Sequence, residues 1–422
     1  MINDGKQRIA IVGAGISGLT AAWYLAQDND VEVFEAGDYL GGHTCTVPVE
    51  RDHGRYAIDM GFIVFNDRTY PNYLKLLDEL GLAGQPTSMG FAVSDQRNGL
   101  EYCGDGLGGV FASKRNWVSP THWRFVREIL RFNKEATALL EDPAGDMPLG
   151  EYLTRHGYSE RFRRDYVLAM GGAIWSCSLA QMEAFPARFF IRFFDHHGLL
   201  SLTNRPQWYV VPGGSNQYVS PLVDRCPATF HVATPVQSVT RHPDHVTVVA
   251  NGETRTFDQV IFACHSDQVL PLLSDADGRE RHCLARLGYQ DNEVVLHTDT
   301  RLLPRRQRVW SSWNAMLMKE ETDRIQVTYN MNILQGIQAP ETFCVTLNAT
   351  DRIDPDTVLE RRHFSHPMFT PDTEAARETL LAANGNNRTW FAGAWCRNGF
   401  HEDGVVSALN VVTALEKKRA VA

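Results

Sequence analysis

The most regular hydrophobic pattern lies near the N-terminus, within residues 8–35. Residues 9–12 form a continuous apolar run, which is typical of a strand buried on both faces of a parallel sheet. A glycine-rich turn follows, then a stretch of helical character from Ser17 to Ala26, and then a second apolar run at 31–34. The order strand, turn, helix and strand predicts a βαβ unit.

The rest of the chain shows the same kinds of pattern in two interleaved parts. Residues 70–80 carry apolar side chains at helical spacing, and short apolar runs at 259–264 and 389–395 predict further buried strands. From about Met89 the pattern changes to alternating positions, a glycine-rich turn and aromatic-rich helices. It changes back at the Pro-Gly-Gly turn of residues 212–214. We therefore expect a second lobe inserted into the first.

The glycine-rich turn after the first strand has the residues needed to bind a dinucleotide. Gly13 permits the tight turn, Gly15 lets the backbone approach a pyrophosphate, and Gly18 lets the helix lie close to the strand. The helix N-terminus offers free N–H groups to the phosphates. Glu35, at the end of the second strand, can accept both ribose hydroxyls. The predicted contacts are Gly13, Ala14, Gly15, Ile16, Ser17, Gly18, Glu35 and Ala36.

The loop after Glu35 indicates which dinucleotide binds. Its residues Gly41-Gly42-His43-Thr44 resemble the second phosphate motif of flavoproteins with two dinucleotide-binding domains, where an arginine usually follows the glycines. This resemblance favours FAD over NAD, with Gly42, His43 and Thr44 as contacts. Since His43 replaces the arginine, charge compensation is expected to be weaker or pH-dependent. The alternative is a solvated loop histidine.

The C-terminal segment repeats the strand, turn and helix pattern. A buried strand reaches Gly393, and a turn over 399–404 leads into an apolar helix over 405–415. A helix N-terminus at this place can direct backbone N–H groups at the N1–C2=O edge of a flavin and stabilise the reduced ring. We therefore expect cofactor contacts from Gly393, Asp403, Gly404 and Val405.

Taken together, these motifs resemble the superfamily of flavin-containing amine oxidases, protoporphyrinogen oxidases and phytoene desaturases. The resemblance rests on the N-terminal glycines, Gly41-Gly42, Asp59-x-Gly61, the 212–214 turn and the 391–393 strand end. It implies non-covalent FAD, with Gly61 and Phe62 beneath the cofactor and Val236 holding the adenine through its backbone. One departure is Ala394-Trp395, where amine oxidases usually carry an acidic residue.

Four further segments resemble a bacterial amine-oxidase-like subgroup, described as predicted NAD/FAD-binding proteins. They are residues 173–176, 197–200, 329–332 and 399–404. Members of this subgroup are often found beside methyltransferases of the cyclopropane-fatty-acid-synthase type, which implies lipid acyl chains as substrates. The segment 396–398 departs from the subgroup, which tends to have an aromatic residue there.

These observations predict an α/β fold with the two-domain architecture of amine oxidases. A Rossmann-like FAD-binding domain is expected over residues 1–85, 208–281 and 384–422. A discontinuous α+β substrate domain is expected over residues 86–207 and 282–383.

Composition limits the partners. The chain has 422 residues and a formal net charge of −9, which argues against an extended nucleic-acid surface. The eight cysteines include no CxxC pair, and the histidines lack a matching carboxylate or cysteine set, so no metal site is expected. The first strand begins too early for a signal peptide, and we expect a cytoplasmic protein. The oligomeric state stays open.

Membrane contact is expected only at the periphery, because no apolar stretch is long enough to span a bilayer. Residues 121–132 and 188–194 interleave basic and aromatic side chains. Such segments can lie on a membrane, here the inner membrane, or they can be core helices with solvated arginines.

The function expected is that of an FAD-dependent oxidoreductase that takes a hydride from a C–H bond of a hydrophobic substrate, such as a lipid or fatty acyl chain. The outcome would be desaturation or double-bond isomerisation. The alternatives are amine oxidation and a flavin-binding partner protein without turnover. The catalytic candidates are Tyr329, Asn332, His401 and Glu402.

Overall fold

A parallel sheet forms the centre of the first lobe in the computed structural model, which describes residues 6–142, 146–201, 203, 205–320 and 324–421. Its strand order is β10-β2-β1-β14-β20, with every pair parallel. The strands are β1 (Arg8–Val12), β2 (Asp30–Phe34), β10 (Thr229–His231), β14 (Gln259–Phe262) and β20 (Thr389–Phe391).

Both faces of this sheet are covered, which explains why its strands are apolar throughout. Ile9 and Ile11 pack toward α1 (Ile16–Leu25) and α16 (His401–Val421), whereas Ala10 and Val12 belong to a separate core on the opposite face. That core includes a three-stranded sheet of β11 (Val236–Arg241), β12 (Val246–Ala250) and β13 (Glu253–Phe257). The predicted βαβ unit and its dinucleotide-binding architecture are confirmed.

A seven-stranded mixed sheet forms the centre of the second lobe, with the order β19-β15-β18-β17-β16-β7-β8. Only β16 and β7 pair in parallel. The strands are β7 (Phe91–Asp95), β8 (Leu100–Cys103), β15 (Tyr289–His297), β16 (Trp313–Leu317), β17 (Gln326–Asn330), β18 (Cys344–Leu347) and β19 (Val358–Pro367).

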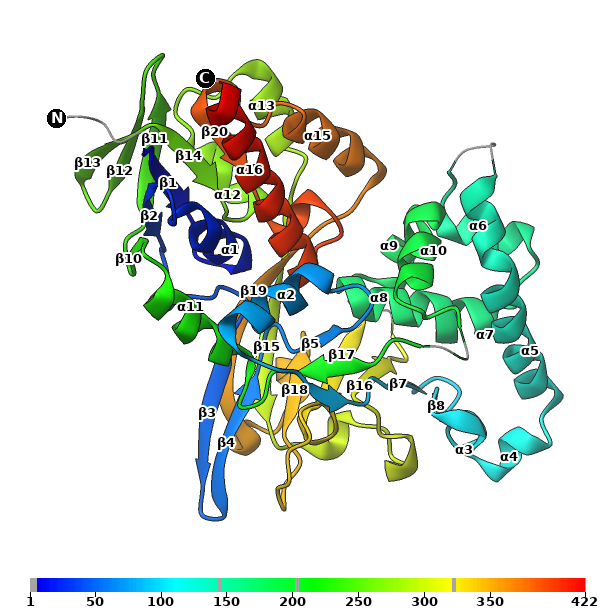
Figure 1. The fold of residues 1–422 in the computed structure, drawn as a ribbon. Coiled ribbons are helices and arrows are strands. Elements are labelled where there is room, and N and C mark those ends of the chain that lie inside the picture. The colour runs from blue at the N-terminus through cyan, green and yellow to red at the C-terminus, as the bar shows by residue number, and fades with distance from the viewer. Residues whose placement is uncertain (1–5, 143–145, 202, 204, 321–323, 422) are drawn as a thin grey trace.

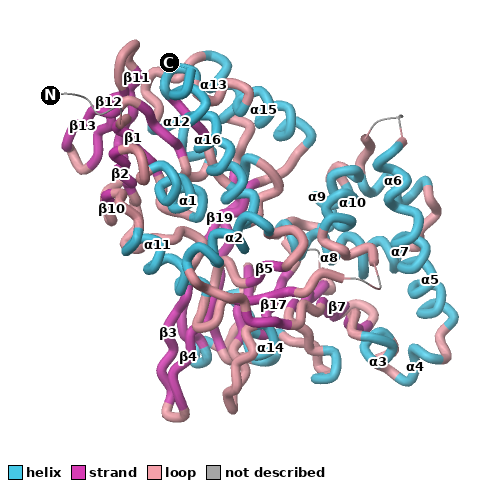
Figure 2. Tube along the Cα trace, viewed as in Figure 1, coloured by secondary structure: helices cyan, strands magenta, loops and turns pink. Residues whose placement is uncertain are grey.

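Helices gather on one side of this second sheet, as Figure 2 shows. They are α3 (Gly106–Val110), α4 (Lys114–Trp117), α5 (Pro120–Glu135), α6 (Leu149–Arg155), α7 (Glu160–Phe162), α8 (Ala169–Trp175), α9 (Leu179–Glu183) and α10 (Ala187–His196). Phe190, Phe193 and Phe194 of α10 are buried in the core of this helical group. The basic and aromatic stretch 188–194 is therefore a core helix, which was the alternative to membrane contact.

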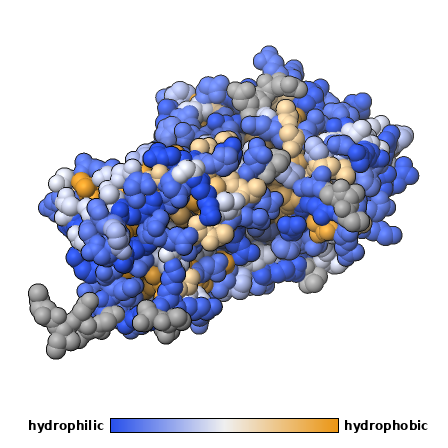
Figure 3. Space-filling view, turned by 90° about the horizontal axis from the view of Figure 1, so that it is seen from above, coloured by the Kyte–Doolittle hydropathy of each residue, from blue (hydrophilic) through white to orange (hydrophobic). Residues whose placement is uncertain are grey.

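The other strands and helices lie outside the two central sheets and the helical group. The strands among them are β3 (Thr46–Arg51), β4 (Gly54–Asp59), β5 (Val64–Asn66), β6 (Gln85–Thr87) and β9 (Trp208–Val210). The helices are α2 (Pro71–Leu80), α11 (Val219–Arg225), α12 (Ser266–Leu272), α13 (Gly278–Leu284), α14 (Met331–Leu334) and α15 (Pro371–Leu381). Seen from above, the surface is mostly hydrophilic, and its apolar patches gather toward the middle of the molecule (Figure 3).

The strands of the two central sheets fall within the ranges predicted for their lobes. Helix α15 falls within the range predicted for the second lobe but packs in the first. Helix α15 packs on α13, and its residues Ala376 and Leu380 join the core beside the parallel sheet. Figure 1 shows α13, α15 and α16 together in the first lobe. The predicted substrate-domain range 282–383 therefore includes a helix that belongs with the FAD-binding side. No described helix is both long and apolar enough to cross a membrane.

Candidate cofactor site

The turn between β1 and α1 has the shape of a phosphate cradle. A Cβ on Gly13 would lie 2.9 Å from the Cys264 nitrogen, and one on Gly18 would lie 1.9 Å from the Gly13 carbonyl oxygen. Only glycine fits at these two positions. A Cβ on Gly15 would meet nothing within 4 Å, so the space in front of this residue is open. Gly15 is the N-cap of α1 and leaves the helix without a side-chain cap, so its first N–H groups are available to an anion.

Glu35 lies beside this turn, as predicted. Its Oε2 accepts a hydrogen bond from the Ala14 N–H at 2.8 Å, and its Oε1 accepts one from the Gly37 N–H at 2.8 Å. The carboxylate keeps acceptor capacity for a ribose diol. The Thr234 N–H donates to the Glu35 carbonyl at 2.7 Å, which brings the start of β11, with the half-buried Val236, to the same end of the sheet. The role of Val236 toward adenine stays a prediction.

The second glycine motif folds over the first. The Gly41 N–H donates to the Ala14 carbonyl at 2.9 Å, and Gly41 forms a parallel bridge with Gly15. A Cβ on Gly42 would lie 3.1 Å from the Gly15 Cα. Both residues have positive φ angles, +120° and +59°. The two glycine motifs therefore form one continuous cradle.

His43 of the second phosphate loop packs against β19. It is half-buried, its Nε2 lies 3.1 Å from the Ser365 carbonyl oxygen, and its ring packs near Phe364, His265 and His366. Burial lowers the pKa of His43, so the imidazole is neutral at physiological pH. The packing of this ring argues against a solvated loop histidine, and contact between His43 and FAD stays a prediction.

The Asp59-x-Gly61 motif ties together segments that are far apart in sequence. The Asp59 carboxylate is buried and accepts hydrogen bonds from the Thr46 hydroxyl at 2.5 Å and from the Ser215 N–H and hydroxyl at 2.8 Å each. Burial raises its pKa to about 6. A Cβ on Gly61 would lie 2.1 Å from the His43 carbonyl oxygen, which accepts from the Phe62 N–H at 2.7 Å. Glycine is therefore required where this segment crosses the second phosphate loop.

The C-terminal turn brings α16 against α1. A Cβ on Gly404 would lie 2.7 Å from the Ile16 Cγ2 and 2.9 Å from the Ser17 Oγ, and Val405 is fully buried in the same core. The Gly393 N–H donates to the Ser407 hydroxyl at 2.9 Å. The absence of a side chain at Gly404 therefore has a packing reason beside the phosphate cradle, and contact between this residue and a flavin ring stays a prediction.

The two acidic residues of this turn have structural roles. The Asp403 carboxylate accepts from the Phe400 N–H at 3.0 Å and caps its own helix, and burial raises its pKa to about 6. The Glu402 carboxylate accepts from the backbone N–H groups of Asn72 and Tyr73 at 3.1 and 2.8 Å and so caps α2. Both oxygens of Glu402 are therefore engaged in structural hydrogen bonds, and its role as a catalytic residue stays a prediction.

His401 belongs to a buried polar network that joins three motifs. Its Nε2 lies 3.0 Å from the Tyr218 hydroxyl, which lies 2.7 Å from the Thr44 Oγ1. The Phe62 ring stacks on the imidazole with 3.6 Å between centroids. Burial lowers the pKa of His401 well below its usual value, so this histidine is neutral. Tyr218 was missed from the sequence, because nothing in its local pattern distinguishes it from an ordinary buried tyrosine.

Tyr329 and Asn332 do not share a strand. Strand β17 ends at Asn330, so the alternation of faces does not extend to Asn332, which lies in α14. The Asn332 Oδ1 accepts from the Phe343 N–H at 2.8 Å, and its Nδ2 donates to the Glu341 carbonyl at 2.9 Å. Asn332 therefore fixes a loop, and its role as a catalytic residue stays a prediction. Tyr329 packs edge-on against Trp313 at 5.0 Å.

Aromatic side chains run from the helical group to the C-terminal turn and form what we call the aromatic wall. Trp175 packs on Phe193 at 5.0 Å, Phe193 stacks on Phe400 at 4.9 Å, and Phe189 stacks on Phe369 at 5.4 Å. Phe400 directly precedes His401. The wall therefore reaches the same turn as the buried network.

Two indole N–H groups near this wall are buried without a hydrogen-bond partner among the described residues. They belong to Trp175 and to Trp313, which contacts Tyr329. The Trp310 Nε1, in contrast, donates to the Pro304 carbonyl at 2.7 Å. Orphaned buried donors are uncommon in proteins, and each of these two can donate to a ligand or to an ordered water.

Comparisons with known proteins agree with this geometry. The family model of flavin containing amine oxidoreductases matches residues 16–326. The chain is 27% identical over 260 residues to AofH of Mycobacterium tuberculosis, whose name assigns it to the flavin-containing monoamine oxidases; the match covers 58% of this chain and 53% of AofH. The chain thus spans about half the length of this curated relative.

Solved structures resemble nearly the whole chain. A fatty acid isomerase from P. acnes that produces CLA has a TM-score of 0.69 at 16% identity, covering 97% of this chain and 99% of its own. Cyclohexylamine oxidase from Brevibacterium oxydans has a TM-score of 0.69 at 16% identity, covering 98% and 99%. At this identity the similarity shows the fold alone.

The residues of the cradle fit FAD. The open space at Gly15, the uncapped start of α1 and the Glu35 carboxylate at the end of β2 provide for a pyrophosphate and an adenosine ribose. With a family model matched over most of its length, the chain belongs to the flavin containing amine oxidoreductase family, and its cofactor is FAD.

Proposed function

We propose that the protein is an FAD-dependent oxidoreductase that acts on a C–H bond of a lipid or fatty acyl chain, by desaturation or double-bond isomerisation. The observation that carries this proposal is the aromatic wall, which extends from Trp175 and Phe193 to Phe400 beside the C-terminal turn. When bound, FAD supplies the hydride acceptor. The chain itself supplies an apolar surface that excludes water and orients the substrate.

The polar groups near the wall favour a substrate with an acceptor head group. The indole N–H groups of Trp175 and Trp313 can donate to a carboxylate, but they cannot bind an ammonium group. His43, His265 and His366 lie together, and burial lowers the pKa of all three, to about 3 for the last two. These neutral imidazoles each have one ring N–H that can donate to an acceptor group. A fatty acid, apolar with one carboxylate, matches this set.

The buried acids of the cofactor site are already committed to the fold. Asp59 binds Thr46 and Ser215, and Asp403 and Glu402 cap helices. A cationic amine would therefore compete with structural hydrogen bonds for these carboxylates. This arrangement supports an acyl substrate over an amine.

Amine oxidation is the second candidate, because AofH and cyclohexylamine oxidase are named for amines, whereas the isomerase from P. acnes is named for fatty acids. Aromatic residues around a flavin would suit an unprotonated amine as well as an acyl chain. A flavin-binding partner without turnover is the third alternative.

The test is to mix the FAD-bound protein anaerobically with unsaturated fatty acids and, separately, with primary amines. The flavin absorbance is followed in a stopped-flow instrument, and the fatty acids are then examined for new or shifted double bonds. We expect chemical change in the fatty acid and none in the amine. Trp175→Phe keeps an aromatic ring at this position but removes the orphaned indole N–H. The variant should have a KM that is raised more for the free acid than for its methyl ester.

Reduction by amines alone would establish amine oxidation instead. If neither class of substrate, nor a total lipid extract, changed or reduced the flavin of the fully loaded protein, the chain would be a flavin-binding partner.

A further inference from the structure

Large apolar side chains are exposed at one corner of the molecule, formed by α3, α4 and the start of α5. The exposed fractions are 68% for Leu107, 48% for Trp117, 80% for Val118 and 42% for Trp123. All four lie within 17 consecutive residues and far from the cradle in sequence. In Figure 1 the α3–α4–α5 corner is the lower right extremity of the helical group.

The rings of this corner are held in place by packing. Trp117 stacks on the buried Phe111 at 4.4 Å, and Trp123 packs on the same ring at 4.7 Å. The Trp123 Nε1 donates to the Trp117 carbonyl at 2.9 Å. The Phe111 N–H donates to the Leu107 carbonyl at 2.9 Å, so α3 joins the same cluster. Rigid aromatic side chains lose little conformational entropy when a partner covers them.

A stripe along α5 extends the corner. Trp123, Arg127, Leu130 and Lys134 follow one another at intervals of three or four residues, and all are exposed. This spacing places them on one line along the helix. Leu130 is 46% exposed. The opposite face of α5 is buried through Phe125 and Phe132, so the helix is fixed to the core while its outer face carries apolar and basic side chains.

The charge of the corner is opposite to that of the chain. Residues 105–135 contain six basic and three acidic side chains, although the whole protein has a formal net charge of −9. Of these acids, Glu128 is buried and bonds to Arg124 and Ser159, and Asp105 and Glu135 lie at the two ends of the segment. Lys114 and Arg115 lie directly before the exposed Trp117. The surface is therefore both apolar and locally cationic.

We propose that the α3–α4–α5 corner docks on an anionic lipid bilayer. Trp117 and Trp123 lie at the level of the head groups, Leu107 and Val118 enter the acyl boundary, and the basic side chains contact lipid phosphates. Tryptophan prefers this interface because its ring is apolar and its N–H is polar. The combination of apolar insertion and basic attraction is that of peripheral membrane proteins.

Two other occupants fit less well. A second copy of this chain would bring an identical cluster of positive charges to the same face, which repels. A nucleic acid would match the charge but would leave Leu107 and Val118 without an apolar partner. The bilayer satisfies both features. This inference does not depend on the proposed substrate, because the docking surface is separate from the cofactor site.

The test measures binding of the FAD-loaded protein to phosphatidylglycerol-rich vesicles by flotation, with phosphatidylcholine vesicles for comparison. We expect binding to the anionic vesicles that weakens with salt. Trp117→Ser combined with Val118→Ser should reduce it on the order of tenfold or more, because two apolar side chains no longer leave water. Lys114→Gln combined with Arg115→Gln should remove much of the preference for anionic lipid.

A matched control replaces an exposed apolar residue elsewhere: Ile333→Ser, at 36% exposure, should leave vesicle binding unchanged. Flavin content and melting temperature check that each variant is folded. Equal vesicle binding by the wild type and the Trp117/Val118 double variant would overturn the proposal. So would sedimentation showing that this double variant abolishes a dimer while the wild type does not bind vesicles, because the corner would then be an interface between copies.

Discussion

The glycine cradle and the aromatic wall are held together by different means. In the cradle, backbone atoms pack directly against other backbone atoms. Gly18 lies so close to the Gly13 carbonyl, and Gly61 so close to the His43 carbonyl, that no methyl group would fit between them. In the wall, large rings such as Phe193 and Phe400 pack at 4.9 Å. The cradle therefore tolerates no added side-chain atom at Gly18 or Gly61, whereas the aromatic wall can accept substitutions that conserve side-chain volume.

The largest effect is expected from comparing two glycines of the cradle. Gly18→Ala places a Cβ 1.9 Å from the Gly13 carbonyl oxygen, and overpacking of this kind costs roughly 3 kcal/mol of folding free energy. Gly15→Val faces open space, so the apoprotein should keep its stability within about 0.5 kcal/mol while losing FAD. Thermal unfolding of the apoproteins and flavin content distinguish the two. A Gly15→Val protein with full flavin content would contradict the cradle assignment.

The second prediction concerns how tightly Glu35 binds the adenosine ribose of FAD. Glu35→Ala should weaken FAD binding by about 1.5–3 kcal/mol for each charge-assisted hydrogen bond lost. Because the two Glu35 oxygens also accept from Ala14 and Gly37, Glu35→Gln is the size-matched comparison: its amide oxygen keeps one of these hydrogen bonds, and its NH2 group cannot accept the other. Equilibrium titration of the apoproteins with FAD measures the difference. Equal affinity in the wild type and Glu35→Ala would place the ribose elsewhere.

The third effect separates structural from catalytic acids. Glu402→Gln removes the charge that caps α2 through Asn72 and Tyr73, and it should destabilise the protein by about 1–2 kcal/mol. Turnover at a temperature where the variant is folded should change little, and the pH profile should not move. A shifted pH profile with unchanged stability would support Glu402 as a catalytic residue.

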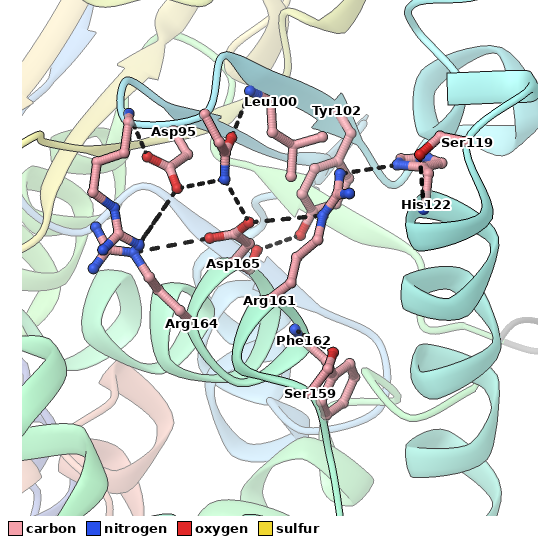
Figure 4. Close-up of polar contacts among 12 residues, drawn as sticks. Asp95, Leu100, Tyr102, Ser119, His122, Ser159, Arg161, Phe162, Arg164 and Asp165 are labelled. Carbon is pink, nitrogen blue, oxygen red and sulfur yellow. Dashed lines mark hydrogen bonds and ion pairs between the residues drawn. The ribbon is translucent and has the colours of Figure 1, made fainter. Parts of the chain in front are cut away.

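A buried carboxyl pair in the helical group predicts a pH dependence of stability. Figure 4 shows Asp165 facing Asp95, with the guanidinium groups of Arg161 and Arg164 on either side. Burial and the charge of Asp95 raise the pKa of Asp165 to about 7. The folded protein therefore holds a proton that the unfolded chain releases near pH 4, so stability falls as pH rises from about 4 to about 7.

Asp165→Asn should remove most of this decline, because the amide mimics the protonated acid. The gain above pH 7 should be on the order of 1–3 kcal/mol relative to the wild type. Denaturant unfolding at several pH values measures it, with the exposed Asp224→Asn as the control. An unchanged slope between pH 4 and 7 in Asp165→Asn would show that another group holds the proton.

The same contrast explains what could be predicted from the sequence. The parallel sheet and the cradle follow from local patterns, because the residues that form them are neighbours in sequence and their geometry is a backbone property. The need for glycine at positions 13 and 18 comes from the local backbone geometry, so it can be inferred without knowing the rest of the chain.

Side-chain partners that lie far apart in sequence could not be predicted in this way. The Tyr218 hydroxyl meets the Thr44 hydroxyl across 174 positions, and the Glu402 carboxylate meets the Tyr73 N–H across 329. Asn332 was expected on the same strand as Tyr329, but the strand ends at Asn330. His43 follows the expected glycines, but its environment is set by β19, which the motif does not contain.

In the proposed function, the FAD-bound protein removes a hydride from an acyl chain. The most direct measurement is anaerobic incubation with an unsaturated fatty acid deuterated beside its double bond, with flavin absorbance and product double bonds followed together. The account predicts a desaturated or isomerised fatty acid that forms more slowly from the deuterated substrate. An unaltered fatty acid, together with flavin reduction by amines, would contradict it.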